Sequence, residues 1–179
     1  MFYGKASTPF EQDQQQDHHP EQPTVSIIGD TVGEMIAQQL AQQLNIEIQL
    51  YHTAALTRQA PRAEQVVYHA DEVIAVMNRG GGWRLACQSG ATRLTSMLIL
   101  AFPLPDQPRN SESLLIQNLL AQGLIKPSHK GIELNDYPYL STHAMHQQKK
   151  LLCAYRDNGQ TAPSTADIAT LMSTIQQTI

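Results

Sequence analysis

The stretch that decides the fold, residues 25–52, reads VSIIGDTVGEMIAQQLAQQLNIEIQLYH. It opens with a short apolar run that ends in a glycine turn at Gly29. Apolar residues then recur at steps of three and four over 31–44, while glutamines fill the opposite side, which predicts an amphipathic helix. A second run rich in β-branched residues follows at 46–51. Because a strand–helix–strand crossover joins parallel strands, the stretch predicts a βαβ unit and a parallel sheet.

The composition is that of an ordinary globular chain. Its 179 residues suffice for one domain with a sizeable core, 41% of them are hydrophobic, and the formal net charge is −4. The acidic balance gives no electrostatic reason to expect a nucleic-acid partner. No apolar run reaches the roughly 18–20 residues that span a bilayer, and no signal-peptide pattern is visible. We therefore expect a cytoplasmic protein with neither a membrane nor a nucleic-acid partner.

Residues 1–23 differ from the rest of the chain. Gln, Asp, Glu, His and Pro dominate there without an apolar period, which predicts a flexible arm ahead of a single domain at 24–179. Metal-ligand side chains occur in the arm at Asp17, His18, His19 and Glu21. Binding a metal there would also cost the conformational entropy of ordering a flexible segment. We therefore predict a solvated tail and no metal site.

Hydrophobic residues change to a period of two after residue 64. A short run at 65–68 is followed by three longer ones, at 72–78, 83–88 and 93–101, which glycine-containing turns separate. This pattern predicts an antiparallel meander. The third run ends in the sequence MLILA, which is apolar enough to return to a buried sheet. The triple glycine at 80–82 is predicted to be a hairpin tip rather than a phosphate-binding loop, because strands flank it on both sides.

The remaining chain predicts two further helices and one strand. Ser111 has the features of an N-cap for a helix that continues to Gly123. An apolar run at 149–155 predicts a strand, and Ser164 or Thr165 caps a final helix. Residues 126–140 show no clear period.

Two cysteines, Cys87 and Cys153, lie far apart in the sequence and within apolar runs. They form no metal-spaced pair. We predict buried free thiols.

The order of these elements resembles an FAD/NAD(P)-binding flavoprotein of the Rossmann type. The resemblance rests on the βαβ start, the meander around Gly82 and Trp83, the buried run at 98–101 and the final strand, loop and helix. The segment 110–134 also resembles the C-terminal part of bacterial FAD/NAD(P)-binding proteins of an uncharacterised oxidoreductase-like group. The resemblance implies an α/β fold with a parallel central sheet and a small antiparallel meander.

In that family the turn after the first strand reads Gly-x-Gly-x-x-Gly and holds the pyrophosphate of the cofactor. Gly29 matches the first glycine, Thr31 stands at the second and Glu34 at the third, with Gly33 one place earlier. The threonine side chain and the charges of Asp30 and Glu34 oppose pyrophosphate binding. The dinucleotide-binding motif is therefore degenerate.

The resemblance also implies which residues would line a cofactor. They are Gly29, Asp30, Thr31, Val32, His52 and Asp157. His52 ends the second predicted strand, where the family carries an acidic residue for the ribose, and Asp157 matches the acidic residue that contacts the ribitol chain. FAD and NAD(P) are the candidate cofactors, and none is expected if the fold is a relic.

Two functions remain open at this point. The first is an FAD/NAD(P)-binding oxidoreductase-like protein of unknown substrate and catalytic residues, in which a flavin would supply the chemistry. The second is a non-catalytic interaction or assembly module built on a relic flavoprotein fold. A dinucleotide ligand belongs to the first, and a protein partner or a homo-oligomer belongs to the second.

Overall fold

A computed structural model describes residues 24–52, 64–105, 107–128, 131–134, 150–155 and 160–178. The arm predicted at 1–23 lies outside the described residues, so its division from a domain at 24–179 stays a prediction.

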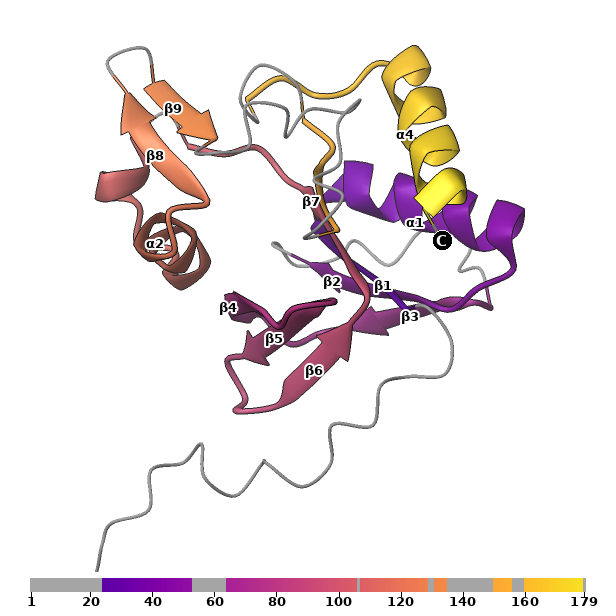
Figure 1. Cartoon of the computed structure of the whole chain (residues 1–179), viewed down its shortest axis with the longest axis horizontal. Helices are drawn as coiled ribbons and strands as arrows, with labels where there is room; N and C mark the ends of the chain where they lie inside the picture. Colours follow the sequence, from indigo (N-terminus) through magenta and orange to yellow (C-terminus); the bar gives the residue numbers. More distant parts are fainter. Residues whose placement is uncertain are drawn as a thin grey trace, which may run out of the picture.

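The centre of the described chain is a parallel sheet of five strands in the order β10-β7-β1-β2-β3 (Figure 1). Its members are β1 (Val25–Gly29), β2 (Ile48–His52), β3 (Val66–His69), β7 (Met97–Ala101) and β10 (Leu151–Cys153). β1 runs parallel to β2 on one side and to β7 on the other. This arrangement confirms the predicted βαβ unit and the Rossmann-like α/β fold. The short run predicted at 65–68 is β3, which extends this parallel sheet beside β2.

Helix α1 (Thr31–Leu44) connects β1 to β2, as the periodicity predicts. It ends where Asn45 adopts the left-handed conformation, with φ of 50°. Helix α4 (Thr165–Thr178) packs beside α1 (Figure 1). Of the two predicted caps of α4, Ser164 and Thr165, the structure has Ser164. Its Oγ accepts from the Asp167 backbone N–H, while the Asp167 carboxylate accepts from the Ser164 N–H.

A second, antiparallel sheet forms the predicted meander. It consists of β4 (Val73–Asn78), β5 (Trp83–Cys87) and β6 (Thr92–Thr95) in sequence order. The third predicted run is not one strand, because the chain leaves this sheet at Ser96 and enters the parallel sheet as β7. The backbone N–H groups of Ser96 and Met97 both donate to the Thr24 carbonyl, and these bonds fix the point of exchange.

The segment after β7 differs most from the sequence prediction. A short 3-10 turn, η2 (Pro108–Asn110), precedes α2 (Leu114–Ala121), and a hairpin of β8 (Ile125–Ser128) and β9 (Gly131–Leu134) follows. The helix cap is Ser113, whose Oγ accepts from the Ile116 N–H at 3.4 Å, and not Ser111 as predicted. Ser111 instead accepts from the Ser113 N–H. The hairpin was not predicted, because 126–140 lacks an alternating pattern.

The central sheet is buried on both faces, which explains its nearly continuous apolar strands. One face packs against α1 and α4 through residues such as Ile36 and Leu171. The other packs against the β4–β6 sheet and α2 through residues such as Trp83 and Leu119. The carboxyl ends of β1, β2 and β7 are therefore the part of the sheet at which a ligand site can open.

Candidate functional site

The turn between β1 and α1 brings three backbone segments into close contact. A Cβ atom added at Gly29 would lie 2.7 Å from the Ala101 carbonyl oxygen and 2.9 Å from the Cα of Gly33. A Cβ at Gly33 would lie 3.4 Å from the side chains of Ala101 and Ile27. Gly29 thus permits the tight turn that the family's first glycine makes. Gly33 packs on the strands one position earlier than the motif places its third glycine, and an added Cβ there would make ordinary van der Waals contacts.

Asp30 caps α1 with its own carboxylate. Its Oδ1 accepts from the Val32 backbone N–H at 2.9 Å, and its Oδ2 accepts from the Tyr155 hydroxyl at 2.8 Å. Burial raises the pKa of Tyr155, and the bond to Asp30 raises it further, so this hydroxyl stays protonated and donates. The Asp30 carboxylate therefore lies where the N–H groups of the helix N-terminus would attract an anion.

The other predicted cofactor-lining residues are spread around this turn. Thr31 is exposed, and Val32 is partly buried between the two hydrophobic clusters. His52 ends β2 directly opposite Gly29, and its ring stacks on Tyr68 at a centroid distance of 6.1 Å. Asp157 lies outside the described residues. The structure thus gathers Gly29, Asp30, Thr31, Val32 and His52 at one edge of the sheet, and their role toward a cofactor stays a prediction.

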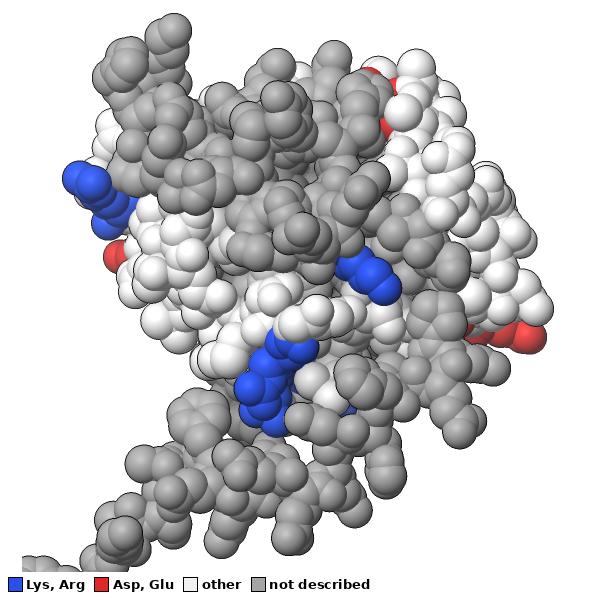
Figure 2. Space-filling model, in the orientation of Figure 1, with Lys and Arg blue, Asp and Glu red and all other residues white. Residues whose placement is uncertain are grey.

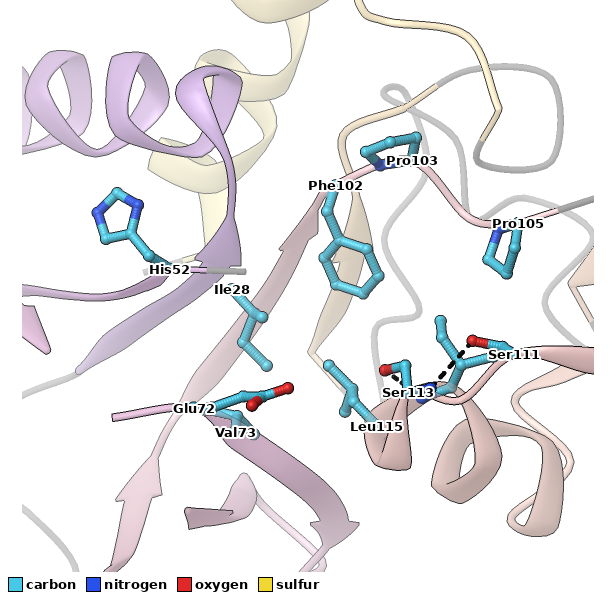
Figure 3. A pocket seen from close by; sticks show the side chains of 11 residues that line it. Ile28, His52, Glu72, Val73, Phe102, Pro103, Pro105, Ser111, Ser113 and Leu115 are labelled. Atoms are coloured by element: carbon cyan, nitrogen blue, oxygen red, sulfur yellow. Dashed lines mark hydrogen bonds between the residues drawn. The ribbon is translucent and has the colours of Figure 1, made fainter. Parts of the chain in front are cut away.

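A cavity of about 370 Å³ opens at this edge (Figure 3). Its lining is mostly apolar, and the polar exceptions include Glu72, whose carboxylate points into the space beside Ile28 and Leu115 (Figure 3). The imidazole of His52 points away from that space. The lining consists of Ile28, His52, Glu72, Val73, Phe102, Pro103, Pro105, Ser111, Ser113, Leu115 and Ile116.

The sequence prediction missed most of this lining. Glu72 directly precedes β4, Phe102 follows β7 and Ser113 is the N-cap of α2, so only tertiary packing brings them together. The one available signal was the position of Phe102 and Pro103 directly after a buried parallel strand, where ligand sites of such sheets form.

A dinucleotide pyrophosphate does not fit the α1 N-terminus as it stands. The Val32 N–H already donates to Asp30, and Glu34 adds a second carboxylate in the first helical turn. Two like charges about 4 Å apart repel by roughly 1–4 kcal/mol near a protein surface, whereas the helix N-terminus attracts an anion by only about 0.3–1 kcal/mol. The repulsion outweighs the attraction, so the turn disfavours a phosphate group.

Replacing Asp30 by alanine is expected to cost about 2 kcal/mol of unfolding free energy. Loss of the cap accounts for about 1 kcal/mol, and the buried Tyr155 hydroxyl left without its acceptor accounts for about as much. Urea denaturation measures the change. Asp30→Asn, which keeps a capping oxygen, is the matched control and should cost less than about 1 kcal/mol. Additive effects of Asp30→Ala and Tyr155→Phe would contradict the coupling between the two side chains.

Tyr51 lies beside this site on β2 and carries an unusual hydroxyl. The side chain is 1% exposed and its ring stacks on His69 at 4.4 Å, yet the hydroxyl has no hydrogen-bond partner among the described residues. Burial raises the pKa of Tyr51 from 10.0 to about 12, and the neighbouring Cys87 and Asp71 contribute in the same direction. The neutral phenol is thus the form that the fold favours.

The stability of the protein should therefore fall at alkaline pH partly through Tyr51. A raised folded-state pKa contributes stability that is fully present below pH 10 and is lost as the pH rises toward about 12. The loss attributable to this group is about 2–3 kcal/mol. Urea melts of the wild type and Tyr51→Phe across this range measure it. The variant should match the wild type at neutral pH, because no hydrogen bond is removed, and parallel alkaline curves for the two proteins would refute the assignment.

Both cysteines are buried free thiols, as predicted. Burial raises the pKa of Cys153 to about 11, which keeps that thiol protonated and unreactive.

Within the described ranges no group of three His, Cys, Asp or Glu residues is placed to hold a metal ion. The described helices include none that is long and apolar enough to cross a bilayer.

Comparisons with known proteins give matches among solved structures alone. No protein-family model matches the chain, and no curated protein does. The atypical thioredoxin reductase TRi from Desulfovibrio vulgaris Hildenborough is 17% identical with a TM-score of 0.36, over 46% of this chain and 36% of that one. An oxidoreductase from Agrobacterium tumefaciens is 15% identical with a TM-score of 0.36, over 49% and 39% of the two chains. LpdA from Mycobacterium tuberculosis is 12% identical with a TM-score of 0.35, over 86% and 34%.

This chain thus spans between 34% and 39% of the length of these three proteins. All three TM-scores and identities are low, so these likenesses assign no function to this chain.

Proposed function

We propose that this chain is a non-catalytic interaction or assembly module on a Rossmann-like fold that works without a bound dinucleotide. The observation that carries the proposal is the Asp30 carboxylate at the N-terminus of α1, held by the Val32 N–H and the Tyr155 hydroxyl. It supplies internally the negative charge that a cofactor phosphate would bring. Thr31 stands at the second glycine position of the motif, and its side chain leaves less room for a phosphate to approach the backbone there.

A second candidate function is that of an FAD/NAD(P)-binding oxidoreductase-like protein. The cavity of about 370 Å³ at the carboxyl ends of β1, β2 and β7 favours it, since ligands of such sheets bind at this edge. The tight turn at Gly29 favours it as well. In this case Gly29, Asp30, Thr31, Val32, His52 and Asp157 would line the cofactor.

One experiment separates the two functions. The absorbance of the purified protein between about 350 and 500 nm reports a bound flavin, and calorimetric titrations with FAD and NADPH report binding to the protein as prepared. If the chain works without a dinucleotide, the purified protein should be colourless, and neither FAD nor NADPH should give a heat of binding. A yellow protein, or saturable binding of either cofactor, would overturn it in favour of the second candidate.

The variant Asp30→Asn tests the physical reason behind the proposal. It keeps the helix cap but removes the charge, so inorganic pyrophosphate should bind the variant more tightly than the wild type. Equal affinities would show that the Asp30 carboxylate is not what excludes the phosphate.

A further inference from the structure

The outer face of the β4–β6 sheet presents apolar side chains where an antiparallel sheet ordinarily presents polar ones. Strand pairing aligns Met77, Arg84 and Leu94 in one row across β4, β5 and β6. Met77 is 45% exposed and Leu94 is 40% exposed, whereas Trp83 on the opposite face of the sheet is buried. Two of the four large exposed hydrophobic side chains of the described residues therefore lie in this one row.

The same sheet is positively charged in an acidic protein. Between Val73 and Thr95 the sequence has three arginines and no Asp or Glu, although the whole chain has a net charge of −4. Asp71 and Glu72 directly precede this stretch, and the Asp71 carboxylate accepts from Ser89 in the turn between β5 and β6. Figure 2 shows Lys and Arg side chains gathered over the position of β5 and β6, with no acidic side chain among them. Charge complementarity thus favours an acidic occupant.

The two edge strands of this sheet, β4 and β6, differ in the hydrogen bonding of their outward backbone groups. At the β4 edge, the Val76 N–H donates to the Asn118 side-chain oxygen at 2.9 Å, and the Val76 carbonyl accepts from the Gln122 amide. Asn118 of α2 and the residue after that helix's end, Gln122, therefore occupy the backbone hydrogen-bonding groups of Val76 at that edge. β6 is the other edge strand, and no further strand pairs with it among the described residues. Its residues Thr92, Arg93 and Leu94 are exposed.

We propose that β6 binds an extended, acidic segment of a partner protein as an added strand. Alternation along such a strand places apolar side chains on the outer face against Leu94 and acidic ones on the other side near Arg93, which is paired with Leu85. Backbone hydrogen bonds to β6 supply affinity, and Arg93 selects acidic sequences. The inference rests on the proposed function and names the chemistry of the partner.

A labelled peptide of about eight residues, alternating valine with glutamate, tests the inference by fluorescence anisotropy. It should bind the wild-type chain saturably and more weakly at high salt, while the counterpart with lysine in place of glutamate should not bind. Leu94→Glu should weaken binding by about tenfold or more, and Arg93→Gln should reduce the salt dependence. Equal binding of the acidic and basic peptides, or no binding of either, would overturn the inference.

Met35→Glu is the matched control, because Met35 on α1 is also 40% exposed but lies away from this sheet. It should change the peptide affinity by less than about twofold, and a loss equal to that of Leu94→Glu would overturn the inference. Circular dichroism confirms that each variant is folded.

Light scattering tests a second copy of the chain as the occupant, since a dimer that Leu94→Glu dissociates would exclude the partner segment. Binding of FAD or NADPH would refute the proposed function. Failure of the acidic peptide to bind would refute the added-strand inference, so the two failures can be told apart.

Discussion

Replacing Trp83 by alanine is expected to lower the free energy of unfolding by about 4 kcal/mol, the largest effect of any single substitution considered for this chain. Trp83 is the only tryptophan of the sequence, it is 1% exposed, and it lies in the cluster that joins the β4–β6 sheet to the central sheet and α2. Truncation leaves a cavity at the centre of this contact. A domain is stable by only about 5–15 kcal/mol, so the variant should unfold at markedly lower urea concentration.

Far-ultraviolet circular dichroism should follow this transition, because the variant lacks the tryptophan whose fluorescence would otherwise report unfolding. Met77→Ala is the control: Met77 lies on β4 but is 45% exposed on the outer face, and its truncation should cost less than about 0.5 kcal/mol. Equal losses for the two variants would mean that the β4–β6 sheet does not pack on the central sheet through its Trp83 face.

The second large effect is expected for Gly29→Ala, at about 3 kcal/mol. The new methyl group would lie 2.7 Å from the Ala101 carbonyl oxygen and 2.9 Å from the Gly33 Cα, and both are backbone atoms that cannot rotate aside. Either β7 or the first turn of α1 must shift. The shift would also disturb the bond from the Asp30 N–H to the Ala101 carbonyl, which measures 3.2 Å.

Gly81→Ala provides the control, since an added Cβ there would meet no atom within 4 Å. Thermal and urea unfolding should show a change below about 0.5 kcal/mol for this variant. The double variant with Ala101→Gly should recover little stability, because the closest contact is the carbonyl oxygen and not the Ala101 side chain. Full recovery would show that the side chain was the obstacle.

The parts of the fold that the sequence predicted are those with a strong local period. The helix at 31–44 and its flanking strands were confirmed because apolar residues repeat there without interruption. The return of 97–101 to the buried sheet was predicted from its continuous apolar run and is confirmed as β7. The break at Ser96 was not predicted, since 93–101 was read as a single run and only the bonds to Thr24 interrupt it. The strands Ile125–Ser128 and Gly131–Leu134 were missed because 126–140 shows no alternating pattern, and Pro127 lacks a backbone donor besides.

The candidate site was predicted in part for a similar reason. Residues next to the β1 turn could be named because the dinucleotide motif is a local pattern. The cavity could not, because Glu72, Phe102 and Leu115 reach it from segments that meet only after folding. The bond between Asp30 and Tyr155 joins residues 125 positions apart, and no local pattern predicts such a contact.

The place of β1 in the sheet has a consequence for how the chain is made. β1 is flanked by β2, which follows it closely, and by β7, which the ribosome delivers some 70 residues later. During translation the βαβ unit is made before β7. The backbone N–H and C=O groups of β1 that pair with β7 therefore stay without hydrogen-bond partners until β7 is made. Chaperone demand and aggregation of nascent chains should therefore peak before Met97 emerges and fall once it has docked.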